Sequence, residues 1–367
     1  MDKLKVITAV MVIAVFLAAC QNKDEHSESK EPDITDVSAA EIEDGKSTIV
    51  TSEEQTSSQE TLKETKKADA KIIEQNVQEL IKNGSRKWNT DSELLAANYL
   101  KKQMESYGYN IHIQEFPAYE FDIMASGNGD YFNLNPYNSE AIGTGHNVIA
   151  DINTGKETDK VLVMTAHYDT VSKELGIIDN TSGVVTLLEV ARLVSELHLP
   201  FNLRFIFFSS EERFLYGSRY YVSSLSSEEL SKIAACINVD MVGYKNGQEL
   251  IVATPYFADD INIVHNSVDG VENSLAKEWH RIFPELETFV KVESSSDHFS
   301  FEKMEIPNMM ITQKYFDVET TRKTDSDLDN LSITELENTI NLIKEYIENL
   351  DISKVYYENI PLVPAVK

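Results

Sequence analysis

Apolar runs alternate along the chain with stretches of helical periodicity. Residues 70–83 and 91–108 carry apolar side chains at helical spacing, and a glycine ends each stretch, as is typical of helix C-termini. The runs at 147–152, 160–169 and 202–210 are apolar without alternation. Such continuous runs are typical of strands buried on both faces. The pattern therefore predicts helices that cover a buried sheet.

The remaining segments continue this alternation. We expect further strands at 109–116, 234–243, 249–255 and 307–313, and further helices at 182–197, 217–225, 273–283 and 332–350. Residues 125–145 are rich in Gly, Asn and Pro, and we expect a loop there. Strands that alternate with helices predict an α/β fold with a mostly parallel sheet covered on both sides. We assign residues 71–367 to one such domain.

The N-terminus has the pattern of a targeting signal. Two lysines precede the apolar residues 6–19, which are too few for a typical transmembrane helix, and Cys20 follows. The sequence "LAAC" at 17–20 resembles the bacterial lipobox. This resemblance implies a signal peptide over 1–19, lipid on Cys20, and an extracytoplasmic protein anchored to a bacterial membrane. An ordinary secretory signal with an incidental cysteine is the alternative.

Residues 20–70 differ in composition from the rest of the chain. From Gln21 to Ala70 there are 14 acidic residues and 6 lysines, a net charge of −8, and aromatic residues are absent. A segment of this kind cannot bury enough apolar surface to offset its loss of conformational entropy. We therefore predict a disordered acidic tether between the lipid and the domain.

The overall charge and the cysteines restrict the function further. The formal net charge of −28 argues against binding to nucleic acid, which requires basic surfaces. Lipidation of Cys20 would leave Cys236 as the remaining thiol, so no intramolecular disulfide is expected. Cys236 lies within an expected strand and is a poor candidate nucleophile, and the chain has no Gly-x-Ser-x-Gly motif.

Ionisable residues follow several of the expected strands. Ligands of α/β sheets bind beyond the carboxyl ends of the strands, so these residues are candidates for one site. The candidates are His167 and Asp169, Asp179 in the following loop, Glu211 and Glu212, Asp240, and Asp297 with His298 at an expected helix start. Each alone has an ordinary explanation, such as a helix cap for Asp179 or a solvated turn for the two glutamates. Their joint occurrence at successive strand ends indicates a site.

Converging carboxylates repel one another unless a cation lies between them. Imidazole and carboxylate ligands together favour Zn²⁺, with Co²⁺ or Mn²⁺ possible. The candidates are too many for one tetrahedral zinc and suit two ions that share a bridging carboxylate. His167 and Asp169 lie two residues apart and would share one face of a strand. Glu211 and Glu212 can both face a site only if the strand has ended before them.

These segments together resemble a known family. "AHYDT" at 166–170, "DNTSG" at 179–183, "SSEER" at 209–213, "NVDMVG" at 238–243 and "SDHFSF" at 296–301 look like the co-catalytic di-zinc exopeptidases of the bacterial leucyl aminopeptidase type. Glutamate carboxypeptidase and glutaminyl cyclase share their fold. The resemblance extends over about residues 72–350 and includes "GSR" at 84–86 and "NVIA" at 147–150. It implies a three-layer α/β/α fold with a mixed, mostly parallel sheet.

The resemblance also implies roles for individual residues. His167 and Asp240 would hold one zinc, Glu212 and His298 the other, with Asp179 bridging, Asp169 supporting His167, and Glu211 as general base. A cis peptide bond would join Asp179 and Asn180. One departure concerns the family's "HTxxD" segment, which reads "KTDSD" here, with Lys323 in the place of the histidine. This departure bears on contacts to the substrate.

The function that follows is a zinc-dependent aminopeptidase that hydrolyses N-terminal residues from peptides, using water activated between two zinc ions. Three alternatives stay open. A glutaminyl cyclase of this family would use one zinc and lack the first histidine ligand, whereas His167 is present. A carboxypeptidase would need cations for the substrate carboxylate, for which Arg213, Arg219, Arg322 and Lys323 are candidates. A catalytically dead lipoprotein that binds peptides is the third.

Overall fold

The computed structural model describes the chain in ten segments. These are residues 66–120, 131–135, 138–154, 158–171, 173–245, 247–254, 273–286, 289–292, 296–314 and 325–357. The proposed signal peptide, Cys20 and most of the acidic tether lie outside the described residues, as do Arg322 and Lys323.

The described strands form one eight-stranded mixed sheet with the order β1-β2-β4-β3-β5-β8-β6-β7. The strands are β1 (Asn110–Tyr119), β2 (Ala141–Ile152), β3 (Val161–His167), β4 (Asn202–Phe208), β5 (Ile233–Val239), β6 (Gln248–Thr254), β7 (Phe289–Val292) and β8 (Asn308–Lys314). β4, β3, β5 and β8 run parallel in the centre of the sheet, and β6 runs parallel to β7. The pairs β1–β2, β2–β4 and β6–β8 are antiparallel. The expected mixed and mostly parallel sheet is confirmed.

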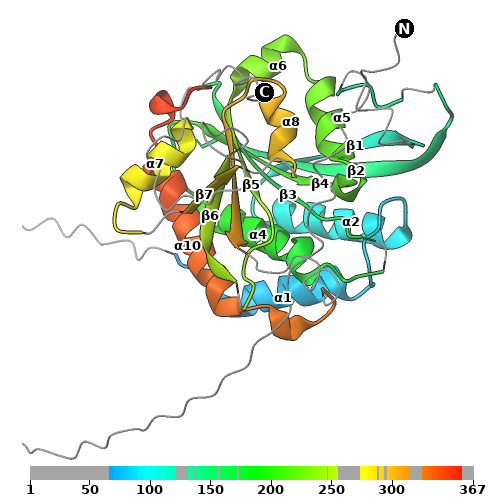
Figure 1. Ribbon diagram of the computed structural model, residues 1–367, viewed down its shortest axis with the longest axis horizontal. Coiled ribbons are helices and arrows are strands. Elements are labelled where there is room, and N and C mark those ends of the chain that lie inside the picture. Colours follow the sequence, from blue (N-terminus) through cyan, green and yellow to red (C-terminus); the bar gives the residue numbers. More distant parts are fainter. Residues whose placement is uncertain are drawn as a thin grey trace, which may run out of the picture. The chain divides into compact units, whose positions relative to one another are not determined.

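Helices cover both faces of this sheet (Figure 1). One layer contains α1 (Ala70–Ile81), α2 (Asp91–Ser106), α4 (Gly183–Val194), α7 (Ser274–Ile282) and α10 (Ile333–Asn349), which contribute to the larger apolar core. The other layer contains α5 (Tyr216–Ser224), α6 (Ser227–Lys232) and α8 (His298–Glu302). α5 and α8 enclose a smaller core that includes Tyr221, Val222 and Phe301. The three-layer α/β/α architecture is thereby confirmed.

The central strands are apolar because both of their faces are covered. Every residue of β3 from Leu162 to His167 is buried, and β5 is buried except for the half-buried Ala234. Cys236 is fully buried in β5, as the sequence suggested. The helices begin where polar side chains cap them: Asp69 caps α1, Thr90 caps α2 and Ser332 caps α10.

The expected loop at 125–145 is wrong in its last five residues. β2 begins at Ala141 and pairs antiparallel with β1, with Gly145 opposite Phe116. A Cβ atom on Gly145 would come within 2.3 Å of the Phe116 ring, so the glycine here makes room for an aromatic side chain. Residues 125–130, 136 and 137 of that segment lie outside the described part of the chain. The short elements α6 and β7 were not expected, because neither is long enough to show a clear periodicity.

The parallel strands bring their carboxyl ends to one edge of the sheet. His167 is the last residue of β3 and lies beside Phe208, the last residue of β4. Asp240 follows the last residue of β5. The segments after these strands therefore meet, which places their polar side chains above a rigid apolar support.

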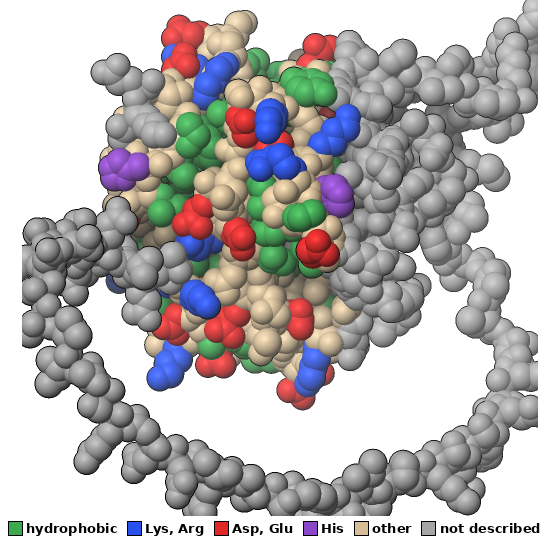
Figure 2. All heavy atoms as spheres, turned by 90° about the vertical axis from the view of Figure 1, so that its left-hand side faces the viewer, with side chains coloured by type: hydrophobic (Ala, Val, Ile, Leu, Met, Phe, Trp, Pro, Cys, Tyr) green, Lys and Arg blue, Asp and Glu red, His purple; other side chains and the backbone are tan. Residues whose placement is uncertain are grey.

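Two further observations concern the molecule's relation to membranes and nucleic acids. Across the described segments, we find no helix with the length and apolar character needed to cross a bilayer. On the face shown in Figure 2, Lys and Arg side chains are scattered among Asp and Glu and form no continuous basic surface.

Candidate metal centre

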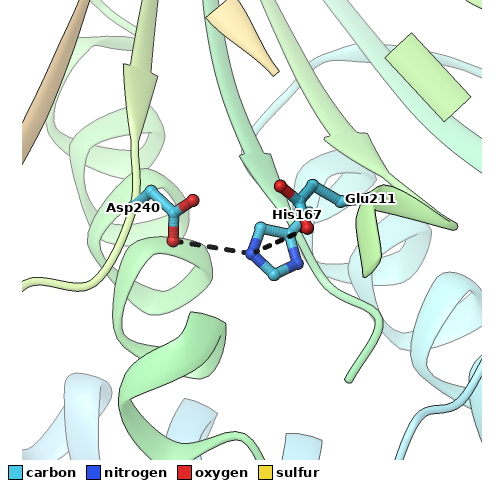
Figure 3. Close-up of side chains that lie close together, drawn as sticks. All are labelled: His167, Glu211 and Asp240. Carbon is cyan, nitrogen blue, oxygen red and sulfur yellow. Dashed lines mark ion pairs between the residues drawn. The ribbon is translucent and has the colours of Figure 1, made fainter. Parts of the chain in front are cut away.

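His167 lies at the centre of a group of carboxylates. Its side chain is 1% exposed, and its Nε2 atom is 3.1 Å from Asp179 Oδ1, 3.5 Å from Asp240 Oδ1 and 4.0 Å from Glu211 Oε2. Figure 3 shows Asp240 and Glu211 approaching the same ring nitrogen of His167. These side chains come from three strand ends and one loop, as the sequence predicted.

Burial and charge act in opposite directions on this group. Burial alone would lower the pKa of His167, but the carboxylates of Glu211 and Asp240 and the contacts to Asp169 and Asp179 raise this pKa well above 6.5. Burial also raises the pKa of Glu211 well above 4.5, with His167 opposing the shift and Glu212 and Asp297 adding to it. The centre thus holds more negative groups than one imidazole can neutralise.

Asp169 approaches the opposite side of the imidazole. His167 Nδ1 lies 3.6 Å from Asp169 Oδ1 and 3.3 Å from the Asp169 carbonyl oxygen. The same carboxylate accepts hydrogen bonds from the backbone N–H groups of Glu211 at 2.9 Å and Glu212 at 3.3 Å. Asp169 therefore connects the end of β3 to the segment after β4 and leaves Nε2 of His167 directed at the carboxylate group.

Asp179 lies in the segment η1 (Ile177–Ser182), immediately before α4, and its own backbone is non-helical, with φ of −107° and ψ of 88°. The peptide bond between Asp179 and Asn180 is cis, as the family resemblance implied. The Asn180 side chain donates to the Val239 carbonyl at 2.9 Å and accepts from the Gly183 and Met241 N–H groups. These bonds attach the loop of Asp179 to the end of β5, next to Asp240.

Asp240 is held from the other side by a serine. Ser296 Oγ donates to Asp240 Oδ2 at 2.5 Å and accepts from Asn238 Nδ2 at 2.7 Å. Asp240 Oδ1 is buried and has no hydrogen-bond donor. One oxygen of Asp240 is therefore fixed, while the other faces the centre.

Glu211 and Glu212 begin the 3₁₀ turn η2 (Glu211–Arg213). β4 has ended at Phe208, and Ser210 has a left-handed conformation with φ of 62°. The strand therefore ends before the two glutamates, as their adjacency required. Glu211 is 9% exposed and faces His167, whereas Glu212 is half-buried.

The structure brings some of the candidate residues close together and leaves others apart. Among the described residues, potential ligand atoms that all lie within 4.8 Å of one another belong to His167, Glu211 and Asp240. Asp179 joins this group through its 3.1 Å approach to His167. Glu212 and His298 are not among these three residues; Glu212 interacts electrostatically with Glu211, and His298 is fully buried at the first position of α8.

Asp297 is the residue of this centre to which sequence reasoning gave no role. Its side chain is fully buried, and burial raises its pKa to about 7, with Asp240 and Asp169 adding to the shift and His167 opposing it. Asp297 therefore interacts electrostatically with the centre, although only its neighbour His298 was assigned. The signal was available, because "SSSDH" contains both side chains.

The residues present fit a divalent metal. A buried imidazole and the carboxylates of Asp179 and Asp240 converge, and Asp240 Oδ1 and His167 Nε2 are buried without a hydrogen-bond partner. Buried polar atoms without a hydrogen-bond partner are costly unless an ion is bound. Mixed nitrogen and oxygen ligands suit zinc.

Comparisons with known proteins agree with this geometry. The sequence profile described as "Peptidase family M28" matches residues 147–347. Leupeptin-inactivating enzyme 1 of Streptomyces exfoliatus is 34% identical over 151 residues, which are 41% of this chain and 29% of the relative. Aminopeptidase YwaD of Bacillus subtilis is 41% identical over 96 residues, 26% of this chain and 21% of the relative. The matches thus span less than a third of these relatives' own length.

Solved structures share the fold. The aminopeptidase from Aneurinibacillus sp. strain AM-1 superposes with a TM-score of 0.61 at 21% identity, covering 81% of this chain and 98% of that one. Bacteroides thetaiotaomicron glutaminyl cyclase gives a TM-score of 0.59 at 18% identity, covering 78% and 100%. At these identities the likeness establishes the fold, while the profile match covers more than half of the chain and includes His167, Asp179, Glu211 and Asp240. The chain belongs to peptidase family M28.

Proposed function

We propose that this protein is a zinc-dependent aminopeptidase that removes N-terminal residues from peptides. The observation that carries the proposal is the buried group formed by His167, Asp179, Asp240 and Glu211 at the carboxyl ends of three neighbouring strands. The imidazole nitrogen and carboxylate oxygens of this group suit zinc. If His167, Asp179 and Asp240 bind the metal, the carboxylate of Glu211 remains available as a base. The sequence relatives named leupeptin-inactivating enzyme and aminopeptidase support the same reaction class.

In this proposal His167, Asp179 and Asp240 hold zinc, and Glu211 is the general base. Bound zinc supplies Lewis acidity that activates water and polarises the scissile carbonyl. Glu211 removes a proton from the attacking water and returns it to the leaving amine. Its buried position suits this role, because burial raises the pKa of Glu211 well above 4.5 and makes it a stronger base than an exposed carboxylate. Asp169 keeps the His167 imidazole oriented through its approach to Nδ1.

We further propose two zinc ions per chain, with Asp179 shared and with Glu212 and His298 at the second position. The support is the sequence pattern and the excess of buried carboxylates around His167. This part has its own test: His298→Ala should lower the zinc content by about one ion per chain. An unchanged zinc content in this variant would assign His298 a different role.

Carboxypeptidase activity is less well supported, because the two described candidate cations already have structural partners. Arg213 donates to the Tyr119 carbonyl at 2.8 Å, and its guanidinium lies 3.8 Å from the ring centre of Trp88. Arg219 is 2% exposed and donates to the Tyr131 carbonyl at 2.8 Å. Neither is positioned as a free cation for a substrate carboxylate.

The proposed function is tested by hydrolysis of leucyl-p-nitroanilide with the full chain before and after zinc is removed by a chelator. Activity that disappears with the metal and returns with added zinc is expected. N-acetyl-leucyl-p-nitroanilide is the control, because an aminopeptidase requires a free amino group. Cyclisation of an N-terminal glutaminyl peptide without hydrolysis of the leucyl substrate would instead identify a cyclase.

We also propose that lipid on Cys20 anchors the protein outside the cytoplasm to a bacterial membrane. The support is the sequence "LAAC" at 17–20 after a short apolar segment. In bacteria fed an alkyne-labelled fatty acid, the wild-type protein should become labelled and sediment with membranes. Cys20→Ser should be unlabelled; equal labelling of both proteins would contradict the anchor.

A further inference from the structure

Two buried charged residues outside the proposed ligand set flank the segment that carries Asp179. Arg86 lies between α1 and α2 and is 1% exposed, and Asp325 precedes the turn η3 (Leu328–Asn330) and is 3% exposed. They are far apart in sequence, yet both bond to the chain between Leu175 and Thr181. Burial raises the pKa of Asp325 to about 7, and several hydrogen bonds offset the cost of burying both side chains.

Asp325 binds three consecutive N–H groups. Its Oδ1 accepts from the Ile178 N–H at 2.6 Å, and its Oδ2 accepts from the Asp179 N–H at 3.1 Å. Its backbone carbonyl accepts from the Ile177 N–H at 3.1 Å. A single residue thereby fixes the backbone that leads into the proposed metal ligand Asp179.

Arg86 connects the same loop to the end of β3. Its Nε donates to the Tyr168 carbonyl at 2.6 Å, Nη1 donates to the Leu175 carbonyl at 2.9 Å, and Nη2 donates to Thr181 Oγ1 at 2.8 Å. Its backbone N–H donates to Thr170 Oγ1 at 2.9 Å. Tyr168 lies between His167 and Asp169, so one guanidinium holds both segments that supply the centre.

The charge of Arg86 also matters. Its guanidinium interacts electrostatically with Asp169, Asp325 and Asp179, which partly balances the negative charge behind the centre. Burial lowers the pKa of Arg86 to about 10, so it still carries its positive charge at neutral pH. A lysine could not replace it, because an ammonium group cannot reach acceptors spread over both segments.

We propose that Arg86 and Asp325 are positioning residues that hold the Asp179 loop against the end of β3 and thereby determine how tightly the centre binds its metal. The effect on metal affinity rests on the proposed function, whereas the positioning of the Asp179 loop does not depend on it. Asp325→Asn should place an amide N–H₂ group against a backbone N–H and lose one of the two bonds. Arg86→Lys should lose the bonds that join the loop to Tyr168.

Two measurements test this proposal separately. Amide hydrogen exchange of the metal-free full chain should show slow exchange at Ile178 and Asp179 in the wild type and faster exchange in Asp325→Asn. Zinc affinity, measured by competition with a chelator, should fall about 10- to 100-fold in Asp325→Asn and in Arg86→Lys. The matched controls are Asp327→Asn, an exposed position two residues away, and Arg281→Lys on the surface of α7; both should retain the wild-type affinity.

The outcomes are distinguishable. Fast exchange at Ile178 in the wild type would contradict the proposed positioning of the Asp179 loop by Asp325. This measurement uses the wild type alone and is therefore possible even if both variants fail to fold. Unchanged zinc affinity in folded Asp325→Asn and Arg86→Lys would overturn the link to metal binding. A wild type that binds no zinc would contradict the proposed function and the proposed effect on zinc affinity. Faster amide exchange in Asp325→Asn would still support the positioning of the Asp179 loop by Asp325.

Discussion

At the scale of single residues, Glu211 has an unusual environment for a carboxylate. It is 9% exposed and lies 4.0 Å from His167 Nε2, and burial raises its pKa well above 4.5. We expect Glu211→Gln to lower kcat by about 10²- to 10⁴-fold, because the amide cannot accept the proton of the attacking water. The measurement is kcat for leucyl-p-nitroanilide together with zinc content, which should stay at the wild-type value. A variant that keeps wild-type kcat would exclude Glu211 as the base.

Ser296 gives a second prediction at this scale. It donates to Asp240 Oδ2 and accepts from Asn238, so it orients the proposed ligand. We expect Ser296→Ala to weaken zinc binding about 10-fold or more, because Asp240 loses the bond that fixes it. Chelator competition measures this effect, and Ser231→Ala, on an exposed turn of α6, is the control. Equal affinities in the two variants would argue against the role of Ser296.

Sequence reasoning identified side chains at strand ends better than those that act from a distance. His167, Asp240 and Glu211 follow apolar runs, so their positions were predictable from the strands alone. Arg86 and Asp325 lie in connecting segments, and only the folded chain brings them to the Asp179 loop. The family resemblance assigned His298 to a zinc, whereas the electrostatic interaction of its neighbour Asp297 with the centre depends on the folded chain.

At the scale of elements, a buried polar group joins α2 to the strands that carry the centre. Glu93 accepts hydrogen bonds from Tyr168 and from Ser209 Oγ at 2.7 Å, and its Oε2 lies 2.9 Å from His146 Nδ1. The hydrogen bond to Glu93 raises the pKa of His146 above 6.5, although burial opposes the shift. This interaction therefore couples the protonation of His146 to the packing of α2 on β2.

A pH-dependent stability follows from that shift. Because the folded-state pKa of His146 is raised, its contribution is fully present below about pH 6.5 and is lost as the pH rises through the folded-state pKa. We expect the stability difference between the wild type and His146→Gln to be greatest in this acidic range and to shrink at alkaline pH. Urea denaturation at several pH values measures it. A difference that grows with pH would contradict the assigned charge state.

The central strand β3 determines where His167 lies, and its packing can be tested directly. Met164 is fully buried in β3, between β4 and β5. We expect Met164→Ala to lower the free energy of unfolding by about 2–5 kcal/mol, because it leaves a cavity in the core. Leu95→Ala, at a position on α2 that is 52% exposed, should change it by less than about 0.5 kcal/mol. Similar losses in both variants would contradict the described core.

The elements themselves were largely predictable, with instructive exceptions. β3, β4 and β5 show mostly apolar runs without alternation, so their existence could be read from the pattern, although the strand expected at 234–243 extends past the end of β5 at Val239. The first part of β2 could not, since Gly143 and Gly145 suggest a loop but in fact admit the side chains of Trp88 and Phe116. The antiparallel pairing of β6 with β8 depends on long-range contacts and has no local signal.

At the scale of the whole molecule, we expect a bound cation to stabilise the folded, negatively charged protein. The chain carries a formal net charge of −28, and several of its carboxylates converge within the folded domain. A cation bound there relieves their repulsion and binds the folded state only. We expect the melting temperature to rise with zinc concentration, and to rise more when zinc binds more tightly. A melting temperature that is independent of zinc, measured by calorimetry, would show that the metal does not bind the native state.

The most direct test of the account is the metal content of the purified full chain, measured by elemental analysis alongside His167→Ala and Asp240→Ala. We expect about two zinc ions per chain in the wild type. Both variants should contain less zinc and show little peptidase activity, with circular dichroism showing that they remain folded. A wild type with no bound zinc, or variants that retain the full zinc content, would contradict the claim that these residues form a metal centre.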